Sequence, residues 1–314
     1  MKALAILLLA VTTQAAVHGQ AARPAAAPDL EGVWNFSTLT PLERPAQFAD
    51  QPSLTDAEAA AFVRETLERN NRDRRDGGAA VDVGRAVNDG WFDRGTALAR
   101  VNGRSLTSLV IEPSNGRIPG LTPAARDRAA AGAADNRAHP ADGPENRSLQ
   151  ERCLAFNAGP PILPGPYNNF LQIFQFGSHV VLFTEMIHDA RIVPIGAGAP
   201  PRLGFGRWLG EPRGHWEGAT LVVESQNFTD QTDVRGSDEQ LRLTERFTRV
   251  DRDTLLYQFT VDNPSAFVRP WTAMLPMTRS EDRMFEYACH EGNYALQDIL
   301  RGARAQEQRE TSRD

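Results

Sequence analysis

The sequence predicts a mostly β fold, an antiparallel β-barrel or sandwich with a few peripheral helices. From residue 170 onward, apolar and polar residues alternate with a period of two through a succession of short segments. Turn-forming residues separate neighbouring segments at 177–178, 251–253 and 280–282. Sequential short strands of this kind favour an antiparallel meander. The expected strands cover residues 170–176, 180–187, 219–225, 240–250, 254–261, 271–278 and 284–289.

The chain ahead of the meander is expected to hold one strand and two helices. Residues 31–38 are rich in β-forming residues and predict the first strand. Thr55 and Glu58 have the spacing of a capping box, and apolar residues then recur at helical intervals. Thr122 followed by Pro123 predicts the start of a second, short helix.

Three other segments complete the predicted layout. Residues 129–146 are rich in Ala, Asp, Gly and Pro, which favours a surface loop. Residues 214–218 are expected to form a turn that leads into the strand at 219–225. Residues 293–303 predict a closing helix.

The first residues have the pattern of an export signal. Lys2 precedes the apolar run 3–11, and small residues follow up to Gly19, so cleavage is expected near Gly19–Gln20. A membrane anchor is the alternative, but no later segment approaches the ~20 apolar residues that a spanning helix needs. We therefore expect a periplasmic or secreted protein without a membrane span in the mature chain. The expected organisation is a signal peptide at 1–19, a flexible tether at 20–30 and a single β-rich domain with helical insertions at 31–314.

The composition excludes several classes of partner and cofactor. The chain has 314 residues, a formal net charge of −6 and no basic stripe, so nucleic acid is not an expected partner. It has no glycine-rich phosphate loop, which argues against a nucleotide cofactor. No closely spaced His or Cys motif for a metal is present, and we therefore expect neither a cofactor nor a metal. The alternative is a nitrogen–oxygen metal site, for which the sequence offers His188, His215, His290, Glu185 and Glu291.

The sequence contains two cysteines, Cys153 and Cys289. In an exported chain an isolated pair is most simply a disulfide, with two free thiols or a metal pair as the alternatives. A crosslink over such a long loop contributes ~4–5 kcal/mol in the chain-entropy model.

Two glutamates are expected to lie on apolar faces of strands. By alternation, Glu245 shares a face with Leu243 and Phe247, and Glu185 shares a face with Phe183. A carboxylate in an apolar environment has a raised pKa unless it is paired, and a raised pKa suits acid–base catalysis. An inward Glu that simply pairs with an Arg is the structural alternative.

Acid–base residues also gather at two strand ends. His188 lies between Glu185 and Arg191, and His290 is followed by Glu291. A histidine near neutral pKa, a carboxylate and an arginine for an oxyanion are the minimum for proton transfer. Alternatively, these histidines only cap strand ends through hydrogen bonds.

A proline-rich segment, residues 159–169, precedes the meander. It either lines the mouth of a pocket with Tyr167, Asn168 and Asn169 or only positions the following strand. Together with Trp271 and Arg191, these three residues are the expected contacts to a substrate or ligand.

Two resemblances follow from these motifs. The opening Gly32-Val33-Trp34, the meander and the late helix are similar to the lipocalin-like (calycin) plan, which implies a barrel around a ligand. Nearly the whole mature chain also resembles a family of exported bacterial proteins of unassigned function. That resemblance is carried by residues 39–45, 70–76, 116–119, 188–191, 216–218, 245–249, 269–272 and 289–294.

The leading hypothesis is an exported enzyme that acts on a small organic molecule by acid–base chemistry in a β-barrel pocket, as a lyase, isomerase or hydrolase. Its catalytic residues would be His188, His290, Glu185, Glu245 and Glu291. The alternative is a non-catalytic, lipocalin-like binding protein for an apolar or aromatic ligand. A third possibility is an envelope interaction module that uses the predicted loop at 129–146.

Overall fold

The computed structural model of the chain describes residues 28–85, 87–157, 159–196, 204–232 and 234–312. The predicted signal peptide and most of the predicted tether lie outside these residues.

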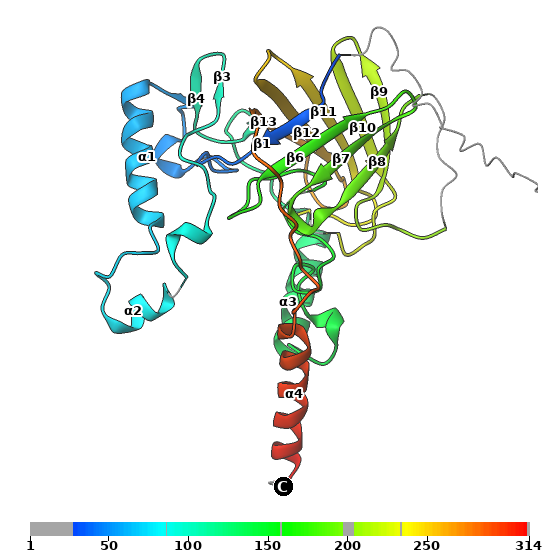
Figure 1. Cartoon of the computed structure of the whole chain (residues 1–314). Helices are drawn as coiled ribbons and strands as arrows, with labels where there is room; N and C mark the ends of the chain where they lie inside the picture. Colours follow the sequence, from blue (N-terminus) through cyan, green and yellow to red (C-terminus); the bar gives the residue numbers. More distant parts are fainter. Residues whose placement is uncertain (1–27, 86, 158, 197–203, 233, 313–314) are drawn as a thin grey trace, which may run out of the picture.

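A ten-stranded antiparallel sheet dominates the fold (Figure 1). Its hydrogen-bonded neighbours follow the order β8-β7-β6-β1-β13-β12-β11-β10-β9, with β5 beside β13. The predicted antiparallel meander is thereby confirmed. The strands are β1 (Gly32–Asn35), β5 (Val110–Glu112), β6 (Phe170–Gln175), β7 (His179–Thr184), β8 (Ala190–Pro194), β9 (Glu211–Glu217), β10 (Thr220–Gln226), β11 (Arg242–Arg249), β12 (Thr254–Asp262) and β13 (Trp271–Ser280).

The sheet curls so that its two edge strands, β8 and β9, approach each other. Among the described residues they are joined by a single isolated bridge, Ile195 to Gly214, and not by a continuous ladder, so the sheet is not a closed barrel. The N–H of Gly196 donates to the Gly214 carbonyl over 3.1 Å. Gly214 permits this approach because a Cβ there would lie 2.5 Å from the Ile195 Cδ1.

The concave side of the curled sheet is filled with side chains, as the period of two predicts. Along β11, Leu243, Glu245 and Phe247 are buried, while the residues between them are partly exposed. Tyr257 and Phe259 on β12 continue the same layer. The predicted face of Glu245 is therefore confirmed.

A smaller unit stands beside the curled sheet. It consists of α1 (Asp56–Asn70) and a three-stranded sheet in the order β2-β4-β3 (Figure 1). The predicted capping box is present, because the Thr55 hydroxyl accepts from the Glu58 N–H and the Glu58 carboxylate accepts from the Thr55 N–H. The three strands are β2 (Ser53–Leu54), β3 (Arg100–Val101) and β4 (Arg104–Leu106).

The remaining helices lie outside the sheets. Figure 1 shows α4 extending away from the sheet beyond α3. The segment 281–294, here called the strap, connects β13 to α4. The helices are α2 (Ala79–Gly84), α3 (Pro123–Ala138), α4 (Ala295–Thr311) and four short 3-10 turns, η1 (Ala46–Phe48), η2 (Asp89–Trp91), η3 (Pro144–Asn146) and η4 (Met186–His188).

Three predicted elements differ from the structure. The expected loop at 129–146 is helical as far as Ala138, because α3 is rich in alanine, the strongest helix former. Residues 214–217 of the expected turn belong to β9, where Gly214 faces Val223 in the ladder with β10, and only Gly218 lies in the turn. The expected strand at 284–289 is part of the strap and pairs with no strand among the residues described.

A disulfide joins Cys153 to Cys289, as predicted, and the two cysteines are 136 positions apart in the sequence. Such a bond is typical of an oxidising compartment. None of the helices in the described ranges is long and apolar enough to cross a membrane.

Candidate functional site

A network of buried charged and polar residues lies inside the curled sheet. Arg191 and Glu245 make a two-pronged ion pair, in which one guanidinium nitrogen donates to the Glu245 Oε1 over 3.1 Å and another donates to Oε2. The Tyr257 hydroxyl donates to the same Oε1 over 2.8 Å and accepts from the Ile162 N–H over 3.0 Å. The network thus joins the two sides of the sheet to the proline-rich segment.

The electrostatics of this network keep the Arg191 guanidinium charged and the Tyr257 hydroxyl protonated. Burial disfavours the charged form of Arg191, but the adjacent Glu245 outweighs this effect and the pKa of the guanidinium is raised. Burial, followed by the Glu245 charge, raises the pKa of Tyr257 well above its ordinary value. Because both Glu245 oxygens already accept hydrogen bonds, the carboxylate is poorly placed to take a proton from a substrate.

Glu185 is buried, but its side chain does not follow the alternation that the sequence suggested. The inward residues of β7 are Val180, Leu182 and Thr184, whereas Phe183 is only partly buried. Glu185 follows the last strand residue with a helical backbone, so strand parity no longer determines its direction. Its Oε1 accepts from the Phe285 N–H of the strap over 2.7 Å, and burial raises its pKa.

The predicted catalytic histidines lie on the surface. His188 is exposed, and its Nδ1 donates to the Tyr287 carbonyl of the strap over 2.8 Å. His290 and Glu291 are both exposed on the strap beyond Cys289. The structure therefore places these three residues outside the interior that contains Glu245. Among the described His, Cys, Asp and Glu residues, no group of three is arranged to hold a metal ion.

The predicted ligand contacts separate into two groups. Tyr167 stacks against Tyr287 of the strap with ring centroids 6.2 Å apart, and Asn168 hydrogen-bonds to Glu185. Asn169 is fully buried and stabilises the loop before β6, where its Oδ1 accepts from the Gly165 N–H over 2.7 Å. Tyr167 and Asn168 therefore contact the strap and Glu185, and Asn169 contacts the loop before β6, whereas Trp271 is the first residue of β13 and lies in the core.

Trp271 belongs to a group of unpartnered polar atoms at one end of the curled sheet. At this end, here called the mouth, β8, β9 and β13 begin and β10 ends, and residues from the segments 155–157, 159–163 and 234–235 line a cavity. Buried polar atoms normally have partners, and two of these atoms, Trp271 Nε1 and Asn157 Oδ1, belong to residues that line a cavity, so they mark a place where a ligand or water belongs. The atoms without a hydrogen-bond partner among the described residues include Trp271 Nε1, Ser225 Oγ, Glu211 Oε1, Arg191 Nε, Asn157 Oδ1 and Ser237 Oγ.

Two cavities adjoin at the mouth. The smaller, here called the mouth cavity, measures about 60 Å³. The larger, here called the groove, measures about 470 Å³ and extends toward α1. They share Asn157, Leu163 and Arg235 as lining residues. The mouth cavity is also lined by Pro160, Pro161, Trp208 and Trp271, and the groove by Leu39, Pro41, Leu42, Arg94, Leu109, Pro164 and Pro166.

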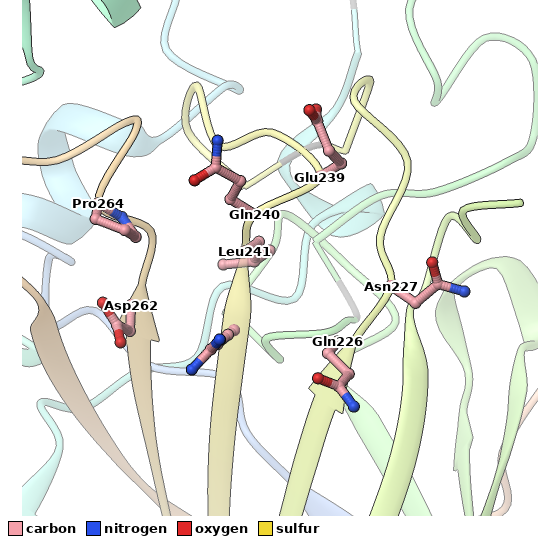
Figure 2. Close-up of a pocket in the computed structure, with 8 residues that line it drawn as sticks. Gln226, Asn227, Glu239, Gln240, Leu241, Asp262 and Pro264 are labelled. Carbon is pink, nitrogen blue, oxygen red and sulfur yellow. The ribbon is translucent and has the colours of Figure 1, made fainter. Parts of the chain in front are cut away.

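A third hollow, of about 380 Å³, lies where β10 ends and β11 begins (Figure 2). It is lined by amides and by charges of both signs, including Glu239, Arg242 and Asp262. Leu241 and Pro264 are its apolar contributions. This composition offers little to an apolar ligand, in contrast to the groove.

The sequence pointed to part of the mouth and missed the rest. The proline-rich segment does line a cavity, but through Pro160, Pro161 and Leu163 and not through Tyr167 and the two amides. Arg235 and Asn157 were not identified, because both lie in irregular loops where no periodicity indicates direction. The segment around Arg235 shows no strand alternation. The one local sign that Arg235 could lie at a site is that Gly236, a turn-forming residue, follows it.

Compared with known proteins, the chain matches no family model, and no curated protein or solved structure is similar enough to count as a match. A functional assignment therefore depends on the geometry of the site.

Proposed function

We propose that this protein binds a small organic molecule at the mouth of its curled sheet and does not catalyse a reaction there. The observation that carries this proposal is the indole N–H of Trp271. The side chain is 1% exposed, its Nε1 has no acceptor among the described residues, and it lines the mouth cavity. A ligand that supplies an acceptor would satisfy this donor.

The acid–base hypothesis has less support from the geometry. Both carboxylate oxygens of Glu245 already accept hydrogen bonds from Arg191 or Tyr257, and His188 and His290 lie on the outer surface. A general acid or base must reach the proton that it moves, directly or through one water. We find no common site for these residues among the parts of the chain that the structure describes.

The proposal adopts the lipocalin-like plan in a modified form. The barrel-like interior is filled by aromatic side chains and the Arg191–Glu245 pair, so the ligand is placed at the mouth and not in the centre. The disulfide and the expected leader support a site of action outside the cytoplasm, in the periplasm or medium. The resemblance to exported bacterial proteins of unassigned function stays a prediction.

The test is a thermal-shift screen with small alcohols, amides and carboxylic acids that carry an aliphatic or aromatic body. We expect some of them to raise the melting temperature of the wild type, because ligands that bind only the native state stabilise it. Trp271→Phe removes the N–H and keeps a ring that packs against Phe259 and Phe267. We expect the Trp271→Phe variant to bind the active compounds about tenfold more weakly, because such a loss of affinity corresponds to roughly one hydrogen bond.

Trp91→Phe is the matched control, because Trp91 is 73% exposed and lines neither cavity. It should bind like the wild type. The proposal fails if no compound shifts the wild type, or if Trp271→Phe binds every active compound as tightly as the control does.

A further inference from the structure

We infer that the ligand is a small amphipathic carboxylate, with its carboxylate in the mouth cavity and its apolar body in the groove; this inference rests on the proposed function. It is carried by the charges and sizes of the two cavities.

The lining of both cavities is cationic. Arg94 and Arg235 contribute positive charge, and neither cavity has an Asp or Glu among its described lining residues. Arg94 is already engaged, with Asp89 at 3.4 Å and the Phe92 ring at 3.7 Å. Arg235 has no hydrogen-bond or ion-pair partner within the described part of the chain, and it lines both cavities. Arg235 is exposed at this junction, where a guanidinium without a protein partner is available to an anionic group.

The sizes of the cavities determine which part of the ligand each one takes. The mouth cavity, at about 60 Å³, has room for a group of the size of a carboxylate but not for a ring. There a carboxylate accepts from the Trp271 Nε1–H and from Arg235. The groove is large enough for a compact apolar body, which packs against Leu39, Leu42 and Leu109.

A third polar group at the junction, the side chain of Asn157, indicates a further functional group on the ligand. Asn157 donates its amide to the Leu163 carbonyl over 3.0 Å, and its buried Oδ1 has no donor among the described residues. A hydroxyl on the ligand next to the carboxylate satisfies this acceptor without adding charge.

Three probes that differ at a single group test the inference. They are 3-phenyllactate, 3-phenylpropane-1,2-diol and 1-amino-3-phenylpropan-2-ol, which are anionic, neutral and cationic at neutral pH and share the ring and the hydroxyl. Isothermal titration calorimetry should show the anion binding at least about tenfold more tightly than the diol, and the amine binding more weakly than both.

The Arg235→Gln variant should lose most of the preference for the anion and retain the affinity for the diol. Arg252→Gln is the matched control, because Arg252 is in the turn between β11 and β12 and its side chain is 88% exposed. Equal or tighter binding of the diol by the wild type would overturn the carboxylate inference while leaving the proposed binding function intact. If neither the probes nor any screened compound binds, both proposals are wrong. A preference for the anion that survives Arg235→Gln would also overturn the inference.

Discussion

Arg191 of β8 and Glu245 of β11 form an ion pair across the interior of the curled sheet, although five strands separate them in the hydrogen-bonding order. Their side chains are only 4% and 0% exposed. The pair therefore links two sides of a sheet whose edges are joined elsewhere by one bridge among the described residues. A buried ion pair adds little net stability compared with apolar residues, but removal of one partner leaves an uncompensated charge in the interior.

Glu245→Gln should therefore lower the free energy of unfolding by about 3–5 kcal/mol, because the amide cannot balance the buried Arg191 charge. The matched control is Glu217→Gln, which removes a surface ion pair with Arg246 that is 2.7 Å long and about half exposed. We expect that change to cost no more than about 1 kcal/mol. Urea unfolding followed by circular dichroism measures both values. Similar losses in the two variants would contradict a special role for the interior pair.

The two glutamates show what the sequence could predict. Glu245 lies in the middle of an eight-residue strand, where alternation determines the direction of every side chain. Glu185 follows the end of β7, where the backbone becomes helical. The alternation rule therefore assigned its side chain to the wrong face, beside Phe183. Strand β9 was hidden because Pro212 and Gly214, both poor strand formers, lie within it.

The mouth was less accessible to prediction for a related reason. Its cavities are formed by loops that come together only after the sheet curls, and a sequence pattern carries no information on such long-range contacts. Trp271 was identified as a contact, but Arg235 lies in a segment without periodicity. Residues in regular strands could thus be placed from the sequence, and those that line the site mostly could not.

The disulfide should be a main source of stability for the strap. The double variant Cys153→Ser and Cys289→Ser is expected to lose up to about 4–5 kcal/mol, because the bond closes a loop of more than a hundred residues in the unfolded chain. Urea unfolding with and without reductant provides the measurement. Reductant should lower the stability of the wild type to the level of the variant and leave the variant unchanged. A wild type that is insensitive to complete reduction would refute this prediction.

The burial of Glu185 predicts a stability that decreases as the pH rises. Desolvation raises the folded-state pKa of its carboxyl above the ordinary value of 4.5, and the opposing Phe285 N–H does not cancel this effect. The folded state then binds the proton more tightly than the unfolded state does. The contribution is complete below the unfolded pKa and is lost as the pH rises through the folded pKa.

Glu185→Gln keeps an oxygen that can accept from the Phe285 N–H and removes the titration. We therefore expect this variant to be more stable than the wild type at neutral pH and to lose less stability between about pH 4 and about pH 8. Burial also raises the pKa of Asp189, so Asp189→Asn serves as the background in which the measurement is repeated. The prediction would be contradicted if the free energy of unfolding changed with pH in the same way for the Asp189→Asn protein and for the double variant that also carries Glu185→Gln.

Gly159 connects the mouth cavity to the interior ion pair, and its backbone is the reason that only glycine suits this position. Its φ is +132°, a region that residues with a side chain rarely adopt. A Cβ would lie 3.5 Å from Ile162 and 3.6 Å from the Arg191 guanidinium, which are ordinary contacts. The cost of Gly159→Ala is therefore backbone strain and not a clash, and we expect a loss of about 1–3 kcal/mol in the free energy of unfolding.

The control for this change is Gly132→Ala in α3, where a Cβ meets nothing within 4 Å. Alanine should stabilise that helix by up to about 1 kcal/mol, because it has the higher helix propensity. If the strain of Gly159→Ala is relieved by movement of residues 159–163, the variant should also bind the mouth ligand more weakly, since Gly159 lines that cavity. Thermal unfolding and calorimetric titration of both variants separate the two effects, and a Gly159→Ala protein as stable as the wild type would show that the strain is absent.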